Sequence, residues 1–121
     1  MTDYIVLLPG NEDTWAGTPE EERQRVYAKH GEFAKALADR GHQVTGGAEL
    51  THSREARVVR RSPTGHDVTE GPYAETAEQL TGFYVISSDD LDDLLDACGI
   101  LADDDGPVEV RACVAGSSGP A

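Results

Sequence analysis

The spacing of apolar and polar residues along the chain predicts a sheet of several strands. Short, continuous apolar runs at Tyr4–Leu8 and Thr81–Ser87 are typical of buried central strands. Residues 108–114 instead alternate between apolar and polar positions, as expected of a strand with one buried face. The same reasoning predicts further strands over Gln43–Leu50, Ala56–Arg61 and His66–Thr69, the last two as a hairpin. Gly46-Gly47 suggests a bulge or a close backbone approach in the first of these strands, and a loop that carries Trp15 is expected after Pro9-Gly10-Asn11.

Two segments have the period of an α-helix. The first begins at Thr18-Pro19-Glu20-Glu21, which has the composition of a capping box, and ends near Arg40, before Gly41. The second opens with Ser87-Ser88-Asp89-Asp90 and ends at Gly99. Each has one apolar stripe that can pack on the sheet. The stripes are Val26, Phe33, Ala34 and Leu37 in the first, and Leu91, Leu94, Leu95 and Cys98 in the second.

The order of these elements predicts an α+β fold of the ferredoxin-like type. An antiparallel sheet with two split crossovers places both helices on one face. The other face then needs a cover, and a second subunit is the simplest one. We expect a single domain over residues 1–115 and a disordered tail over residues 116–121, which are rich in glycine and serine.

The charge balance argues against several classes of partner. The 121 residues hold 23 acids and 10 bases, for a formal net charge of −13. Such a field repels phosphate backbones and anionic lipid, so we expect no nucleic-acid or membrane binding. No apolar run is long enough to span a bilayer, and the opening residues have no signal-peptide pattern, which together predict a cytoplasmic protein.

His30 is the sharpest candidate for chemistry. It lies four residues after Val26 and three before Phe33, on the helical stripe that should face the sheet. A histidine there can act as an acid or a base near neutral pH. The alternative, which position alone favours, is a core histidine that is hydrogen-bonded for structural reasons.

A second candidate is the segment that follows the predicted hairpin. Glu70 comes at a strand end, beside the rigid turn Gly71-Pro72, where it could be aimed into a cleft to orient a histidine. Glu75 and Glu78 complete an acidic trio, although their position favours solvated loop acids as the interpretation of those two. Tyr73 and Tyr84 could each offer a hydroxyl to a ligand, or could serve only in packing.

The remaining polar groups predict no metal centre and no cofactor. The spacing of His42, His52 and His66 does not resemble a zinc site, and Asp103-Asp104-Asp105-Gly106 lacks the rest of a calcium-loop pattern. Cys98 and Cys113 are interpreted as idle thiols. The basic residues Arg54, Arg57, Arg60 and Arg61 either bind an anion or pair with the acids of residues 89–96 across an interface.

Several of these motifs resemble, in order and spacing, the YCII-related proteins of the branch named for its Asp-Gly-Pro-Phe motif. The resemblance runs from the Tyr4–Leu8 strand through His30 with Phe33, and through Gly46-Gly47 with Leu50. It is strongest over Glu70-Gly71-Pro72-Tyr73, with Glu75 and the Gly82–Ile86 strand after it.

The resemblance implies a ferredoxin-like fold that pairs into a dimeric α/β barrel. It also implies a cleft in which the family's histidine, here His30, and its acidic residue, here Glu70, form a proposed active site. Two positions depart from the motif, since Glu70 stands for an aspartate and Tyr73 for a phenylalanine. The family's biochemical activity is mostly unassigned.

Three functional hypotheses follow. The first is a cofactor-independent enzyme in which His30 acts on a small organic molecule, Glu70 orients it, and Tyr73 lines the pocket with Gly71, Pro72, Glu75 and Tyr84. The second is a non-catalytic module that binds a small ligand in the same cleft. The third is an accessory protein whose acidic surface docks to a transcription regulator.

Overall fold

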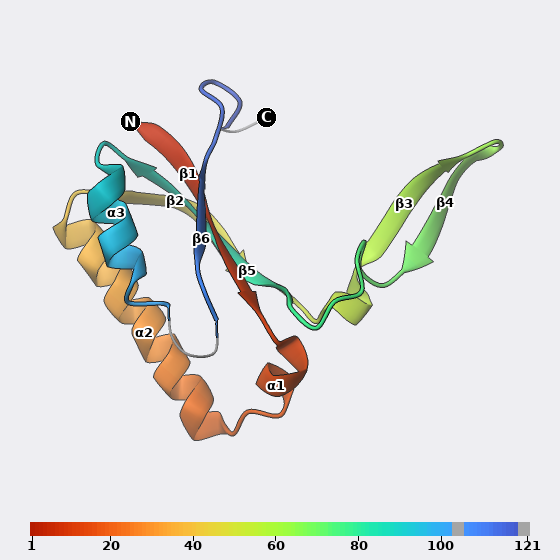
Figure 1. The fold of residues 1–121 in the computed structure, drawn as a ribbon, viewed down its shortest axis with the longest axis horizontal. Coiled ribbons are helices and arrows are strands. Elements are labelled where there is room, and N and C mark those ends of the chain that lie inside the picture. The colour runs from red at the N-terminus through yellow and green to blue at the C-terminus, as the bar shows by residue number, and fades with distance from the viewer. Residues whose placement is uncertain (103–105, 119–121) are drawn as a thin grey trace.

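The computed structural model describes residues 1–102 and 106–118, which form an α+β fold around an antiparallel sheet. The four strands of this sheet lie in the order β2-β5-β1-β6 (Figure 1). Neighbouring strands are antiparallel throughout. With α2 and α3 as the two crossovers, this is the ferredoxin-like topology that the sequence predicts. The strands are β1 (Thr2–Gly10), β2 (Gln43–Glu49), β5 (Gln79–Ser88) and β6 (Glu109–Ala112).

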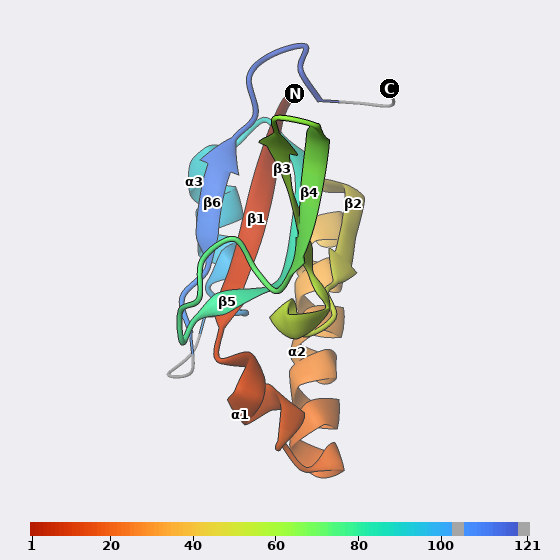
Figure 2. The same ribbon diagram turned by 90° about the vertical axis from the view of Figure 1, so that its right-hand side faces the viewer.

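Both long helices lie on one face of the sheet (Figures 1 and 2). They are α2 (Glu20–Asp39) and α3 (Leu91–Cys98). The core forms between these helices and the sheet, because alternate residues of β1 and β5 point toward them. The fully buried core members are Val6, Phe33, Leu37, Ile86, Leu94 and Ala97.

Alternation also gives the sheet a second apolar face, which no helix covers. The register pairs Ile5 with Val85 and Leu7 with Phe83, between the pairs that face the helices. All four of these side chains keep part of their surface accessible to solvent. The open face expected from the sequence is therefore present.

A separate two-stranded hairpin projects from that open side. It consists of β3 (Arg57–Ser62) and β4 (Gly65–Glu70), which pair only with each other. A short 3-10 turn, η1 (Ser53–Glu55), precedes it. Figures 1 and 2 show the hairpin standing away from the sheet, on the side opposite to the helices. Hereafter we call residues 57–70 the arm.

The bulge predicted in β2 is confirmed. The register with β5 shifts between Val44 and Gly46. Gly47 has φ +146°, a backbone conformation that side-chain-bearing residues rarely adopt. The glycine pair thus brings the β2 backbone close to β5.

Some local predictions at the helices were wrong. The chain forms a short helix, α1 (Glu12–Ala16), where we expected a loop, with the Asn11 side chain as its cap. Thr18 does not cap α2; its hydroxyl donates instead to the carbonyl of Thr14, because α1 ends beside it. In α3 the side-chain cap is Asp90, and Ser88 accepts from the Asp90 N–H.

Other expectations have mixed outcomes. Ala34, predicted on the buried stripe of α2, is exposed, whereas the thiol-bearing Cys98 is buried as predicted. The acidic run 103–105 and residues 119–121 lie outside the described residues. No helix in the described ranges combines the length and apolar character that crossing a membrane requires.

Candidate functional site

His30 and Tyr84 form a close pair between α2 and β5. His30 Nδ1 lies 2.7 Å from the Tyr84 hydroxyl, and both side chains are partly buried. The helical period turns His30 toward the sheet, as predicted, and strand alternation turns Tyr84 toward the helix. Phe33, one turn further along α2, packs against Tyr84 with ring centroids 5.4 Å apart. Two residues of α2 therefore hold the tyrosine in place.

Burial keeps both members of this pair uncharged near neutral pH. It lowers the pKa of His30 from the usual value for histidine, and the nearby Glu49 carboxylate partly opposes that shift. Burial likewise raises the pKa of the Tyr84 phenol. A neutral imidazole next to a neutral phenol has two arrangements, in which either group donates to the other. Nε2 of His30 accordingly acts as an acceptor in one arrangement and as a donor in the other.

The carboxylate near His30 is that of Glu49, at the end of β2. The Tyr27 hydroxyl, one helical turn before His30, donates to Glu49 over 3.3 and 3.4 Å. Burial first, and then Glu49, raise the pKa of Tyr27. Tyr27 also meets Trp15 of α1 edge-on, at a centroid distance of 5.8 Å. These contacts connect α1 to the His30 region through Tyr27 and Glu49.

Glu70 lies elsewhere, at the end of β4. Its carboxylate is 3.9 Å from the Arg57 guanidinium across the arm. Within the described ranges, no hydrogen bond or ion pair joins it to His30. Glu70 instead lines a hollow of about 390 Å³ together with Gly71, Pro72 and Glu75. Four of the residues predicted from the signature segment are thus brought together, but around a different histidine.

That histidine is His52, which stands between two carboxylates. Its Nε2 lies 2.7 Å from Asp13 Oδ1, and its Nδ1 lies 3.3 Å from Glu12 Oε2. Nδ1 also accepts the backbone N–H of Arg54 at 3.1 Å, which places the proton of a neutral ring on Nε2. Asp13 therefore accepts from the ring. Because α1 and η1 are far apart in sequence, no spacing in the chain indicated this cluster.

The Glu12 carboxylate holds the His52 cluster in place. The residue is only 8% exposed, and its carboxylate accepts the backbone N–H of Ser53 at 2.9 and 3.1 Å as well as the Ser53 hydroxyl. A buried carboxylate with this many donors is held in one place. It fixes η1, and with it the base of the arm, against α1.

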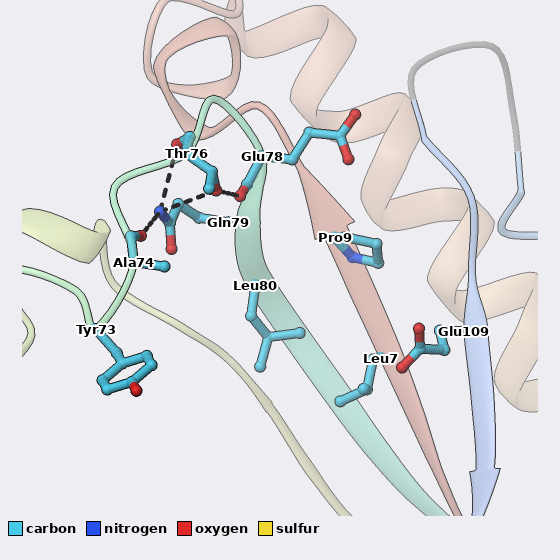
Figure 3. Close-up of a pocket in the computed structure, with 9 residues that line it drawn as sticks. All are labelled: Leu7, Pro9, Tyr73, Ala74, Thr76, Glu78, Gln79, Leu80 and Glu109. Atoms are coloured by element: carbon cyan, nitrogen blue, oxygen red, sulfur yellow. Dashed lines mark hydrogen bonds between the residues drawn. The ribbon is translucent and has the colours of Figure 1, made fainter.

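Tyr73 faces a second hollow, of about 420 Å³, at the end of the open sheet face (Figure 3). Leu7, Pro9 and Leu80 supply its apolar lining, and Glu78 and Glu109 supply two carboxylates. The adjoining loop is tied by the Gln79 amide, which donates to the Ala74 carbonyl at 2.7 Å. Tyr73 itself is 85% exposed, so its ring lies at the rim.

A third histidine, His42, belongs to a buried network at the other end of the sheet. Nδ1 lies 2.8 Å from Ser88 Oγ and Nε2 lies 2.7 Å from Asp93 Oδ2. A hydrolase triad uses the same three residue types, but there Nε2 faces the serine and Nδ1 the aspartate, whereas His42 has the reverse arrangement. Ser88 is also only 1% exposed. The network joins β2, β5 and α3, and its role is structural.

Arg40 extends this network to the surface. Its guanidinium bonds to Asp93 at 2.6 Å and to Asp96 at 2.9 Å. Arg40, and then His42, lower the pKa of Asp93 to about 2. Two of the acids of residues 89–96, considered above as partners for the arginine cluster across an interface, are therefore already paired within the chain.

The described residues hold no group of three or more histidine, cysteine or acidic side chains arranged to bind one metal ion. The Asp103–Asp105 run that was weighed as a calcium site lies outside those residues. The titratable side chains that the structure brings into contact are grouped around His30 and around His52.

The chain is similar to a known domain family and to a known bacterial protein. The model of the YCII-related domain matches residues 2–105. An uncharacterised protein of Rhizobium meliloti (strain 1021) is 32% identical over 111 residues, which cover 89% of each of the two chains.

Proposed function

Because the chain belongs to the YCII-related domain family, which its match over residues 2–105 establishes, we propose that it acts on a small organic molecule through His30, without a cofactor. The observation that carries the proposal is the 2.7 Å contact between His30 Nδ1 and the Tyr84 hydroxyl. A neutral histidine with a lowered pKa is a competent base at neutral pH. While one ring nitrogen reacts, the Tyr84 phenol can donate a proton to the other ring nitrogen or accept one from it.

Each neighbour of His30 has a distinct part in this proposal. Tyr84 orients the imidazole and selects its tautomer, as a hydrogen-bond partner on one ring nitrogen does. Glu49 supplies a negative charge that favours the protonated ring once it has taken a proton. Glu49 thereby takes the part that the sequence resemblance gave to Glu70.

Glu70, Gly71, Pro72 and Glu75 are proposed to bind a small ligand in the hollow that they line, apart from His30. Support comes from the hollow that they line beside His52 and Arg54. Its walls combine one cationic side chain with several carboxylates, which suits a small zwitterionic or amino-bearing molecule. Tyr73, on the neighbouring rim, is proposed to close over it.

The first test is the pKa of His30 by NMR. We expect a value below that of a free histidine. Glu49→Gln should lower it further because a favourable charge is lost, Tyr84→Phe should change it, and Glu70→Gln should leave it unaltered. A His30 pKa that equals the value of a free histidine and ignores both Glu49 and Tyr84 would remove the acid–base site.

The second test is a screen of small acids and carbonyl compounds for turnover. His30→Ala should abolish any turnover that is found while the fold is kept. If the compounds bind but do not react, and His30→Gln binds them equally well, the second candidate function, a non-catalytic binding module, is correct. That alternative is favoured by the separation of the signature hollow from His30.

We further propose that the protein is a homodimer and works in the cytoplasm. The support for dimerisation is the open sheet face, where Ile5, Leu7, Phe83 and Val85 are only partly covered. Burying a contiguous apolar face of this kind against a second copy lowers the free energy of the pair.

A further inference from the structure

The arm exposes an apolar strip that its own chain leaves uncovered. Val59 and Val68 are directly paired across the two strands and are 63% and 56% exposed. They lie on the same face of the arm as Arg61, two residues nearer the tip. Isolated two-stranded hairpins are marginally stable in water, and cross-strand valine pairs contribute most when they are buried.

The charge of the arm is opposite to that of the whole molecule. Arg57, Arg60 and Arg61 are three of only ten bases in a chain of net charge −13. Arg57 pairs with Glu70, and Arg60 lies over the Tyr73 ring at 6.0 Å. Arg61 makes no ion pair with any residue that the structure describes. The strip therefore ends in a cation that is available to an acidic partner surface.

The hollow of Figure 3 has the complementary character. Its lining of Leu7, Pro9 and Leu80 is apolar, and Glu78 and Glu109 place carboxylates at its edge. It belongs to the same open sheet face from which the arm projects. One surface thus offers apolar side chains with a cation, and the other offers an apolar hollow with anions.

We propose that in the homodimer the arm of each copy packs into the sheet hollow of the other copy. Val59 and Val68 lie against Leu80 and its apolar neighbours, and Arg61 faces Glu109 and Glu78. With strands of six residues, the arm reaches about 20 Å, enough to extend along a facing sheet. A two-fold axis repeats the contact, so that both arms and both hollows are filled at once.

The proposal rests on the homodimer proposed above and goes beyond it, because it names the element that each copy contributes. It also makes the ligand region a shared one. The arm ends at Glu70, and Tyr73 lines the hollow that receives the partner's arm. The second copy would then form one wall beside the signature segment.

The test is a charge exchange followed by sedimentation equilibrium. Arg61→Glu and Glu109→Arg should each raise the dimer dissociation constant by about tenfold or more, because each places like charges together. The double variant should recover most of the loss. Arg25→Glu, which reverses an exposed charge on α2, is the matched control and should have little effect.

Photo-cross-linking tests which residues of the two copies are in contact. A photoreactive side chain at position 59, in a mixture of isotope-labelled and unlabelled chains, should cross-link between chains to residues near positions 7, 9 and 80. The same side chain at position 58, on the opposite face of the arm, should not. Val59→Thr should weaken the dimer without changing the stability of the monomer, since Val59 is exposed there.

The outcomes separate the two proposals. A wild-type chain that stays monomeric at high concentration overturns both the dimer and the packing of the arm. A dimer whose dissociation constant ignores Arg61→Glu and Glu109→Arg leaves the dimer standing but overturns the arm contact. Cross-links from position 59 that stay within one chain, or that reach other parts of the second copy, would overturn the arm contact as well.

Discussion

Gly47 lies directly opposite Tyr84 in the pairing of β2 with β5, and a Cβ at position 47 would stand 3.1 Å from the Tyr84 Cα. The same Cβ would be 2.6 Å from the Phe83 carbonyl oxygen. The bulge glycine therefore lets the edge strand approach the residue that holds His30. The geometry of the candidate site depends on a position that bears no side chain.

The first prediction concerns the close approach of β2 to β5 at Gly47. Gly47→Ala should lower the free energy of unfolding by about 1–3 kcal/mol from its backbone conformation alone, and by more through the clash with Phe83. The displaced strand should also shift the NMR signals of the His30 ring. Chemical denaturation measures the first effect and a histidine-selective spectrum the second.

Gly31→Ala is the control for that experiment. Gly31 is exposed within α2, and a Cβ there would meet nothing within 4 Å. The substitution should raise the unfolding free energy by roughly 0.5–1 kcal/mol, because alanine is the better helix former. If both alanine variants behaved alike, the close approach of β2 to β5 would be wrong.

The second prediction concerns pH. Burial lowers the pKa of His30 in the folded chain below the unfolded value, so this histidine's contribution to stability is complete above about pH 6.5. The contribution is lost as the pH falls through the folded pKa. His30→Gln should therefore gain stability relative to the wild type between pH 7 and pH 5. A difference that stays constant over that range would contradict the assigned burial.

The third prediction concerns the stability of the fold at low pH. Arg40, and then His42, hold the pKa of Asp93 at about 2, so this carboxylate stabilises the fold above the unfolded value of about 4. The stabilisation is lost as the pH falls toward 2. Asp93→Asn should thus be less stable than the wild type at pH 7, and the two curves should converge near pH 2. Asp92→Asn, on the same helix, is the matched control.

The fourth prediction concerns the anchor beneath His52. Glu12→Gln replaces a buried acceptor oxygen by a donor facing the Ser53 N–H, which should cost about 1–3 kcal/mol. It should also loosen the base of the arm, measured as faster amide exchange at residues 53–57. Asp13→Asn alters a side chain that is 86% exposed and should change stability by less than about 0.5 kcal/mol. Equal effects of the two substitutions would remove the anchoring role.

The sequence was most informative where the period of a single helix or strand decides the direction in which a side chain points. The helical period alone turns His30 toward the sheet, and strand alternation alone turns Tyr84 toward the helices. The glycine pair of β2 signalled its bulge because few other causes put two glycines inside a strand. The ferredoxin-like topology could be predicted from the order of these helices and strands along the chain.

Patterns could not indicate which side chains would meet across the fold. Glu49 approaches His30, and Glu12 and Asp13 flank His52, because segments tens of residues apart converge in space. The carboxylate chosen from the sequence, Glu70, instead lies at the end of the arm beside Arg57. The helix α1 was missed because five residues are too few to display a period.

Trp15 gives this arrangement a natural optical reporter. It is the sole tryptophan of the chain, with the Arg23 guanidinium 5.1 Å from its ring and Tyr27 against its edge. It shares α1 with Glu12 and Asp13, and Tyr27 connects it to Glu49. Any molecule that disturbs the His52 hollow or the His30 pair would change the surroundings of this one fluorophore. Its emission can thus reveal binding without any added label.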